Sequence, residues 1–177
     1  VFLMQFFNFT AQGAHIQDAG TIIRFLPILF AALYFAKKGK LNFIVPTIAI
    51  VLFIAHPIGR TVWYFSLFWT IPIIAYFFRD RFLFARALGT TFTAHAVGGA
   101  LWIWIFSLPS AVWNSLIPVV AIERLLFALG ITGSFVLVNN LLCLLEKKHL
   151  LNLDFHINSK YLIPALRECH KTKTSTT

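Results

Sequence analysis

The sequence predicts an all-α fold, a polytopic bundle of transmembrane helices, from three observations. Hydrophobic residues make up 59% of the 177 residues, and charged residues only 12%, whereas soluble domains carry about 25% charged residues. Long apolar runs fill the chain. Short basic clusters recur at every second gap between these runs, at 37–40, 79–86 and 147–148. Because Lys and Arg beside membrane helices gather on the cytoplasmic side, these clusters predict location, orientation and helix number together.

Five apolar runs are the candidate spans, in chain order 22–36, 43–55, 61–78, 82–106 and 116–145. A span needs about 20 residues, so the first two runs must extend into their flanks. The last run is long enough to tilt, or to break near Gly130 and Gly133. Each run is expected to be a helix, since lipid offers no hydrogen-bond partners to the backbone. The apolar stretch 1–9 predicts the end of a truncated helix, which gives six helices in total.

The charge pattern also predicts the topology. With 37–40 in the cytoplasm, the gaps 56–60 and 107–115 lie outside and both termini lie inside. Residues 1–145 form the transmembrane domain, and 146–177 form a basic cytoplasmic tail. In this tail, 159–170 is expected to be an amphipathic helix on the inner leaflet, followed by a disordered end. The expected location is a bacterial cytoplasmic (inner) membrane.

The sequence argues against a nucleic-acid-binding protein, a metalloprotein and an enzyme. The net charge of +9 does not indicate nucleic acid, because the basic residues sit at the ends of apolar runs and in the tail, where anionic membrane lipids are the expected partners. Cys143 and Cys169 have no metal-like spacing. The motifs HExxH, GxSxG and the phosphate loop do not occur in the sequence, so we expect no metal, no cofactor and no enzymatic activity.

Glu123 and Arg124 are the sharpest functional candidates, because ionisable groups inside an apolar run are costly in lipid. On the predicted span, they lie about 10 Å from its outer end. Adjacent helix positions point about 100° apart. We therefore expect that the two side chains do not face each other, and that one of them pairs with another helix. A structural ion pair and a ligand-binding role both stay open, since buried ion pairs are poor stabilisers by themselves.

His95 lies near the middle of the fourth run. Thr91, His95, Gly98 and Trp102 follow i, i+4, i+7 and i+11, so they share one helical face. Such a stripe suits either a seam between packed helices or the wall of a ligand site.

The predicted outer gaps add further polar candidates. Arg60 and Tyr64 share a helical face, and an arginine beside an aromatic ring offers both a fork for an anion and a stacking surface. The full set of predicted substrate-binding residues is Arg60, Tyr64, His95, Trp102, Asn114, Glu123 and Arg124. Near the inner end of the last run, Asn139 and Asn140 either cap the helix or bond across helices.

The segment Ala32-Leu33-Tyr34-Phe35-Ala36 spells an AxxxA motif. Together with six helices, cytoplasmic termini and binding groups toward the outer face, this resembles the S components of energy-coupling-factor vitamin transporters, over about 1–145. In that family the motif lies on the first helix and docks the coupling subunit, whereas here it falls on the second predicted helix. The resemblance implies a coupling subunit and ATPases as partners.

The leading hypothesis is therefore an integral membrane substrate-binding protein for uptake of a small molecule, aromatic or anionic. Arg60 would hold an anionic group, Tyr64 and Trp102 would stack on a ring, and His95, Asn114 and Glu123 would offer polar contacts. The alternative is a non-transporting scaffold or assembly factor of an envelope complex. A membrane enzyme that uses His95 and Glu123 as acid and base is a third possibility.

Overall fold

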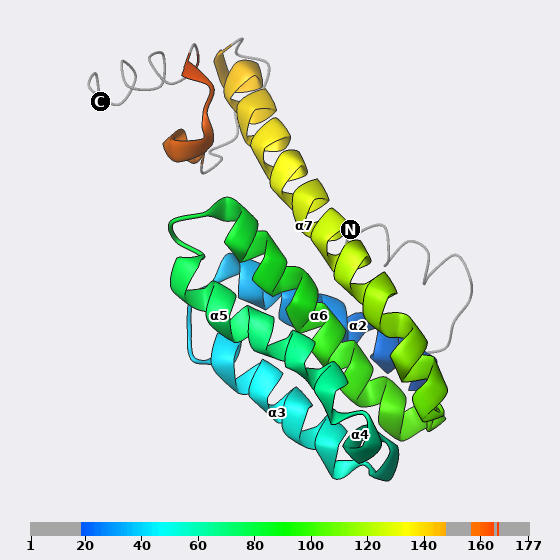
Figure 1. Ribbon diagram of the computed structural model, residues 1–177. Coiled ribbons are helices and arrows are strands. Elements are labelled where there is room, and N and C mark those ends of the chain that lie inside the picture. Colours follow the sequence, from blue (N-terminus) through cyan, green and yellow to red (C-terminus); the bar gives the residue numbers. More distant parts are fainter. Residues whose placement is uncertain (1–18, 148–156, 165, 167–177) are drawn as a thin grey trace. The chain divides into compact units, whose positions relative to one another are not determined.

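The computed structural model describes residues 19–147, 157–164 and 166, and every regular element in these residues is helical (Figure 1). The all-α prediction is confirmed for this part of the chain. The predicted helix at 1–9 and the predicted disordered end of the tail lie outside the described residues. The helices are α2 (Ala19–Ala36), α3 (Leu41–Ala55), α4 (Pro57–Thr61), the 3-10 helix η1 (Trp63–Thr70), α5 (Ile71–Phe78), α6 (Leu83–Phe106), α7 (Ser110–Lys147) and the 3-10 turn η2 (Ser159–Tyr161).

The third predicted run, 61–78, is helical but divided. Pro57 opens α4, and the His56 side chain caps it by accepting a hydrogen bond from the Ile58 N–H at 3.3 Å. The chain leaves helical geometry at Val62, where φ is −119° and ψ is 33°. It then tightens into η1, and Pro72 stands at the start of α5. A proline has no N–H to continue an i→i−4 ladder, which is the physical reason for a change of helix type here.

The long helix α7 begins earlier than predicted. It starts at Ser110, six residues before Leu116. The polar sequence around Ser110 and Ser115 resembles a loop, yet it forms the first turns of the helix. As a result Glu123 lies 13 residues from the first residue of α7, about 20 Å along the axis, instead of the expected 10 Å.

Only α7 has the length and apolarity of a membrane span among the described helices, over Ser110–Glu146. The apolar segments Phe25–Ala36, Leu41–Ala55 and Trp63–Phe78 are shorter. The structure therefore confirms a bundle of helices near the predicted positions. That the bundle spans a membrane is proposed below.

By internal packing the chain forms two compact units, Val1–Ala128 and Leu129–Thr177, whose boundary falls within α7. The predicted boundary at 145 rests on composition and stays a prediction. In the first unit, α6 is the central helix and contacts α2, α3, α5 and η1, which lie alongside it in Figure 1. Its small residues permit this closeness. A Cβ atom on Gly89 would lie 2.2 Å from the Tyr34 hydroxyl, and one on Gly99 would lie 2.5 Å from the Trp69 ring.

The core of the first unit is aromatic. Phe53 lies edge-on to Trp69 and to Trp113, with ring centroids 5.0 Å apart in both pairs. Phe65 packs against Trp113 at 4.9 Å. These side chains are almost fully buried. Because large aromatic side chains dominate burial, this cluster fixes how α3, η1 and the start of α7 pack together.

Two arginines cap the carboxyl end of α2, where helix carbonyls lack partners. Arg79 donates to the carbonyl oxygens of Lys37 at 3.1 Å and Phe35 at 3.3 Å. Arg86 donates to Phe35 at 2.6 Å and to Ala36 at 3.4 Å. Beside them, Lys38 pairs with Asp80. The clusters 37–40 and 79–86 thus meet at one end of the first unit, called the basic end below, as the predicted topology requires.

The second unit joins the last turns of α7 to the segment that contains η2. The Asn139 side chain donates to the Asn158 carbonyl oxygen at 3.1 Å and accepts from the Asn158 N–H at 2.9 Å. The Asn140 side chain donates to the Tyr161 carbonyl oxygen at 2.9 Å and accepts from the Ile163 N–H at 2.8 Å. An apolar cluster lies beside these bonds, formed by Cys143, Ile157, Leu162 and Leu166. The asparagine pair therefore binds another segment and does not simply cap its own helix.

Candidate functional site

The predicted site residues fall into two groups in the first unit, and one residue lies apart from both. Arg60, Tyr64 and Asn114 lie on α4, η1 and the start of α7. His95, Glu123 and Arg124 lie farther along α6 and α7. Trp102 is 47% exposed, and its ring packs on Phe106 at 5.4 Å.

In the first group, the Tyr64 hydroxyl donates to Asn114 Oδ1 at 2.6 Å. This bond joins η1 to α7 across 50 residues of sequence. Arg60 is exposed on the short helix α4. The structure thus unites Tyr64 with Asn114, two of the predicted residues from different elements.

Three buried nitrogens in or beside the second group have no hydrogen-bond partner: Trp69 Nε1, His95 Nε2 and Arg124 Nε. We call them the nitrogen cluster. The His95 ring lies 6.2 Å from the Trp69 ring and 5.6 Å from the Phe65 ring, centroid to centroid. Arg124 is close enough for its charge to act on the His95 imidazole. One further buried nitrogen in the described residues is unpartnered, Nε of Arg79, whose other two guanidinium nitrogens bond to α2.

Glu123 and Arg124 correct the expectation that they do not face each other. Arg124 Nη2 lies 2.9 Å from Glu123 Oε2, so the two neighbours form an ion pair. The angle between their Cβ directions is large, but the long arginine side chain reaches across it. The Arg124 guanidinium also lies over the Phe127 ring at 5.0 Å. No pairing of either side chain with a charged group on another described helix is observed.

A side chain of helix α6 contacts the backbone of Arg124. The Thr91 hydroxyl is 3.4 Å from the Arg124 carbonyl oxygen and donates to it, and it also bonds the Leu88 carbonyl oxygen at 3.0 Å. Thr91 and His95 are four residues apart on the same face of α6. The predicted stripe on α6 is therefore partly a helix seam at Thr91 and partly the wall of the nitrogen cluster at His95.

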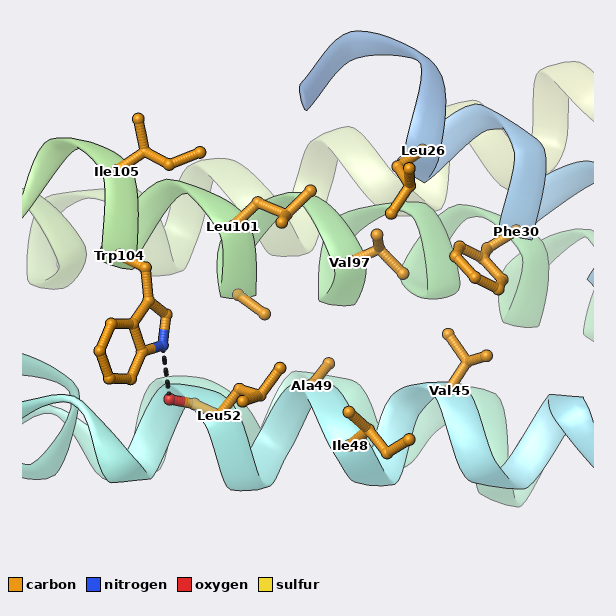
Figure 2. A pocket seen from close by; sticks show the side chains of 11 residues that line it. Leu26, Phe30, Val45, Ile48, Ala49, Leu52, Val97, Leu101, Trp104 and Ile105 are labelled. Carbon is orange, nitrogen blue, oxygen red and sulfur yellow. Dashed lines mark hydrogen bonds between the residues drawn. The ribbon is translucent and has the colours of Figure 1, made fainter. Parts of the chain in front are cut away.

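A separate apolar groove of about 520 Å³ runs between α2, α3 and α6 (Figure 2). At one end the Trp104 indole N–H donates to the Leu52 carbonyl oxygen at 3.0 Å. The predicted site residues do not line this groove, whose walls are Leu26, Phe30, Val45, Ile48, Ala49, Leu52, Val97, Ala100, Leu101, Trp104 and Ile105. Sequence reasoning missed it, because groove-lining and lipid-facing apolar residues look the same in a sequence.

Trp69 is the other functional candidate that the sequence did not single out. It stands in an aromatic-rich segment, where it cannot be told from core packing by pattern alone. In the described residues, no group of three His, Cys, Asp or Glu side chains could hold a metal ion.

Comparison with protein-family models, curated proteins and solved structures gave no match for this chain.

Proposed function

We propose that this chain is an integral membrane protein that binds a small molecule for uptake and works with partner subunits. The outer surface of the first unit supports the membrane location. Val51, Phe77 and Ile122, on three different helices, are 61%, 68% and 62% exposed. Soluble monomers rarely expose apolar patches of large extent, whereas lipid is a good solvent for them. The basic end would then face the cytoplasm of a bacterial cell.

The lengths of the helices are compatible with this location. Helix α2 has 18 residues and α3 has 15, which gives about 27 and 23 Å at 1.5 Å per residue. The hydrocarbon core of a bilayer is about 30 Å thick. A short helix is accommodated by local thinning of the bilayer at a modest cost.

The nitrogen cluster is the observation that carries the binding function. More than about 90% of buried polar groups in folded proteins have a hydrogen-bond partner, and each unpartnered one costs about 1–3 kcal/mol. A group of such nitrogens is expected where something other than the chain completes the bonds. Trp and Arg side chains can only donate, so the ligand must present acceptor oxygens, as a carboxylate or a carbonyl group does.

The aromatic neighbours of the cluster suggest the rest of the ligand. Phe65 and Trp69 offer ring faces and edges beside His95, and such surfaces pack well against a small planar molecule. Arg60, exposed on α4 four residues before Tyr64, would attract an anion from outside. Glu123 would hold Arg124 in place through their ion pair. Trp102 is not part of this site.

The partner subunits are proposed from the surface of α2. Ala32 and Ala36 of the AxxxA motif are exposed, while Tyr34 between them is 1% exposed. Small residues on an exposed helical face let a second helix approach closely in a membrane. A coupling subunit that docks there, together with ATPases, would supply the energy for uptake.

The test is ligand stabilisation of the purified protein, measured as its melting temperature against a panel of vitamins, nucleobases and organic anions. We expect at least one ligand with acceptor oxygens to raise the melting temperature of the wild type. Arg124→Gln should abolish that rise, because the nitrogen cluster loses its cation. The control Arg81→Gln, at an exposed position outside the site, should keep it. A flat response across the panel contradicts the binding function.

A further inference from the structure

A second hollow of about 250 Å³ lies beside the apolar groove, at the basic end. Phe30 of α2 and Val45 of α3 line both hollows, so the two are neighbours. The second hollow is more polar than the first, and its wall includes Tyr34, Lys37, Lys40, Asn42 and Thr93. We call these two neighbouring hollows together the groove, with the apolar hollow as its apolar section and the residues around Lys37 and Lys40 as its basic section.

The length of the groove matches one leaflet of a bilayer. Along α3 it runs from Leu41 to Leu52, about 17 Å at 1.5 Å per residue. Half of a hydrocarbon core about 30 Å thick is about 15 Å. In Figure 2, Val45 and Ala49 from α3 face Val97 of α6 and Phe30 of α2 across the apolar section.

The lining of the apolar section favours a hydrocarbon occupant. This hollow has a volume of about 520 Å³, and its lining is almost entirely apolar. An extended acyl chain fits such a space and buries its apolar surface there.

The charges at the basic end favour an anion there. Lys37 and Lys40 are exposed and line the polar hollow. The described acidic residues of the first unit are Asp80 and Glu123, which pair with Lys38 and Arg124. Neither acid therefore neutralises Lys37 or Lys40, and Arg79 and Arg86 add positive potential beside them.

We propose that the groove binds an anionic phospholipid of the cytoplasmic leaflet, with one acyl chain in the apolar section and its phosphate headgroup between Lys37 and Lys40. This inference rests on the proposed membrane location. It does not depend on the nitrogen cluster, which is lined by other residues.

The test is native mass spectrometry of the purified protein, titrated with phosphatidylglycerol or with phosphatidylcholine of the same acyl chains. The wild type should retain one phosphatidylglycerol and prefer it by about 10- to 30-fold, as expected for two lysines near an anionic headgroup. The double variant Lys37→Gln, Lys40→Gln should lose this preference. The charge-matched control Arg81→Gln, Lys160→Gln, at exposed positions that do not line the groove, should keep it.

A second pair of variants tests the apolar section. Val45→Trp should fill the groove and weaken the binding of both lipids by about tenfold. Ile44→Trp, at an exposed neighbouring position outside the groove, should leave both unchanged. The inference would be overturned if the wild type bound both lipids equally, or if Val45→Trp bound lipid fully. It would also be overturned if the protein were a dimer without lipid, because a second copy would then cover the groove. The small-molecule melting shift, measured in the same variants, reports separately on the nitrogen cluster.

Discussion

The two units of the chain treat their buried polar side chains differently. In the second unit, the amides of Asn139 and Asn140 use both the oxygen and the nitrogen in hydrogen bonds to residues 158–163. In the first unit, ring nitrogens of Trp69 and His95 are buried without any partner. A satisfied polar group holds a structure together, whereas an unsatisfied one weakens it. The contrast is what the proposed function predicts, in which the first unit keeps polar groups available for a molecule that is not part of the chain.

The comparison of satisfied with unsatisfied polar groups can be tested at the basic end of the first unit. The largest loss of stability is expected there. Arg79 is 3% exposed and donates to two carbonyl oxygens at the carboxyl end of α2, those of Phe35 and Lys37. Arg79→Met should lower the free energy of unfolding by about 4 kcal/mol, since hydrogen bonds to charged groups are worth about 1.5–3 kcal/mol each. Arg79→Lys should give an intermediate loss, because it keeps the charge and loses the fork.

Chemical unfolding in detergent measures both arginine variants, with Arg81→Gln as the surface control. A loss no larger for Arg79→Met than for Arg81→Gln would show that the capping bonds carry little stability.

The asparagine pair should give the next largest effect. The double variant Asn139→Leu, Asn140→Leu removes four hydrogen bonds to the segment around η2. At about 1 kcal/mol for each bond, the segment should open more easily by about 3–4 kcal/mol. Hydrogen exchange of the Asn158 and Ile163 amides measures the opening. Ser134→Ala, on an exposed face of α7, is the control, and equal exchange in both variants would contradict the assignment.

His95→Phe should act in the opposite direction. The variant replaces an unpartnered ring nitrogen by carbon, which removes the cost of burying it, so the ligand-free protein should gain about 1 kcal/mol. For a chain of this length that is a rise of about 2–4 °C in melting temperature. The same variant should lose the ligand-dependent rise. If the variant is less stable and still responds to ligand, His95 stabilises the fold, as Asn139 and Asn140 do, and does not bind ligand.

The smallest effect concerns pH at the basic end. The hydrogen bond from the Lys38 side chain lowers the pKa of Asp80 below its ordinary value of 3.8. A carboxyl group with a lowered pKa stabilises the fold above its unfolded-state pKa, and this contribution is lost as the pH falls through the lower folded-state value. The pair is exposed, so the effect should be small.

Melting temperatures of the wild type and of Asp80→Asn, compared from pH 7 into the acid range, measure this contribution. The small advantage of the wild type should be constant above about pH 5. It should decline as the pH falls through the ordinary value of 3.8 and vanish only below the lowered folded-state pKa. An advantage that persists in acid would remove the Lys38–Asp80 pair as its source.

The helix positions could be predicted from sequence, because apolar runs bounded by charges mark α2, α3, α6 and α7 clearly. The early start of α7 could not, since Ser110 and Asn114 are ordinary loop residues until the helix that contains them is seen. Pro57 and Pro72 could have indicated that the third run is divided.

The candidate site was only partly predictable. Tyr64 and Asn114 were placed in one set and do bond to each other. His95 and Arg124 were also placed together, and they interact electrostatically. Trp69 was missed because the role proposed for it depends on a ligand that completes its hydrogen bond, and a sequence does not display ligands. The ion pair of Glu123 with Arg124 was wrongly excluded, because Cβ directions do not limit a side chain as long as arginine.

The hydrogen bonds of the asparagine pair to residues 158–163 have one further consequence. The two amides recognise main-chain groups, so these hydrogen bonds place no demand on the side chains of the stretch. Its apolar contact with α7 comes from Leu162. The stretch nevertheless cannot slip forward by one position: Pro164, which follows Ile163, has no N–H to offer Asn140. A single imino acid thus blocks one of the two ways in which this segment could shift along α7.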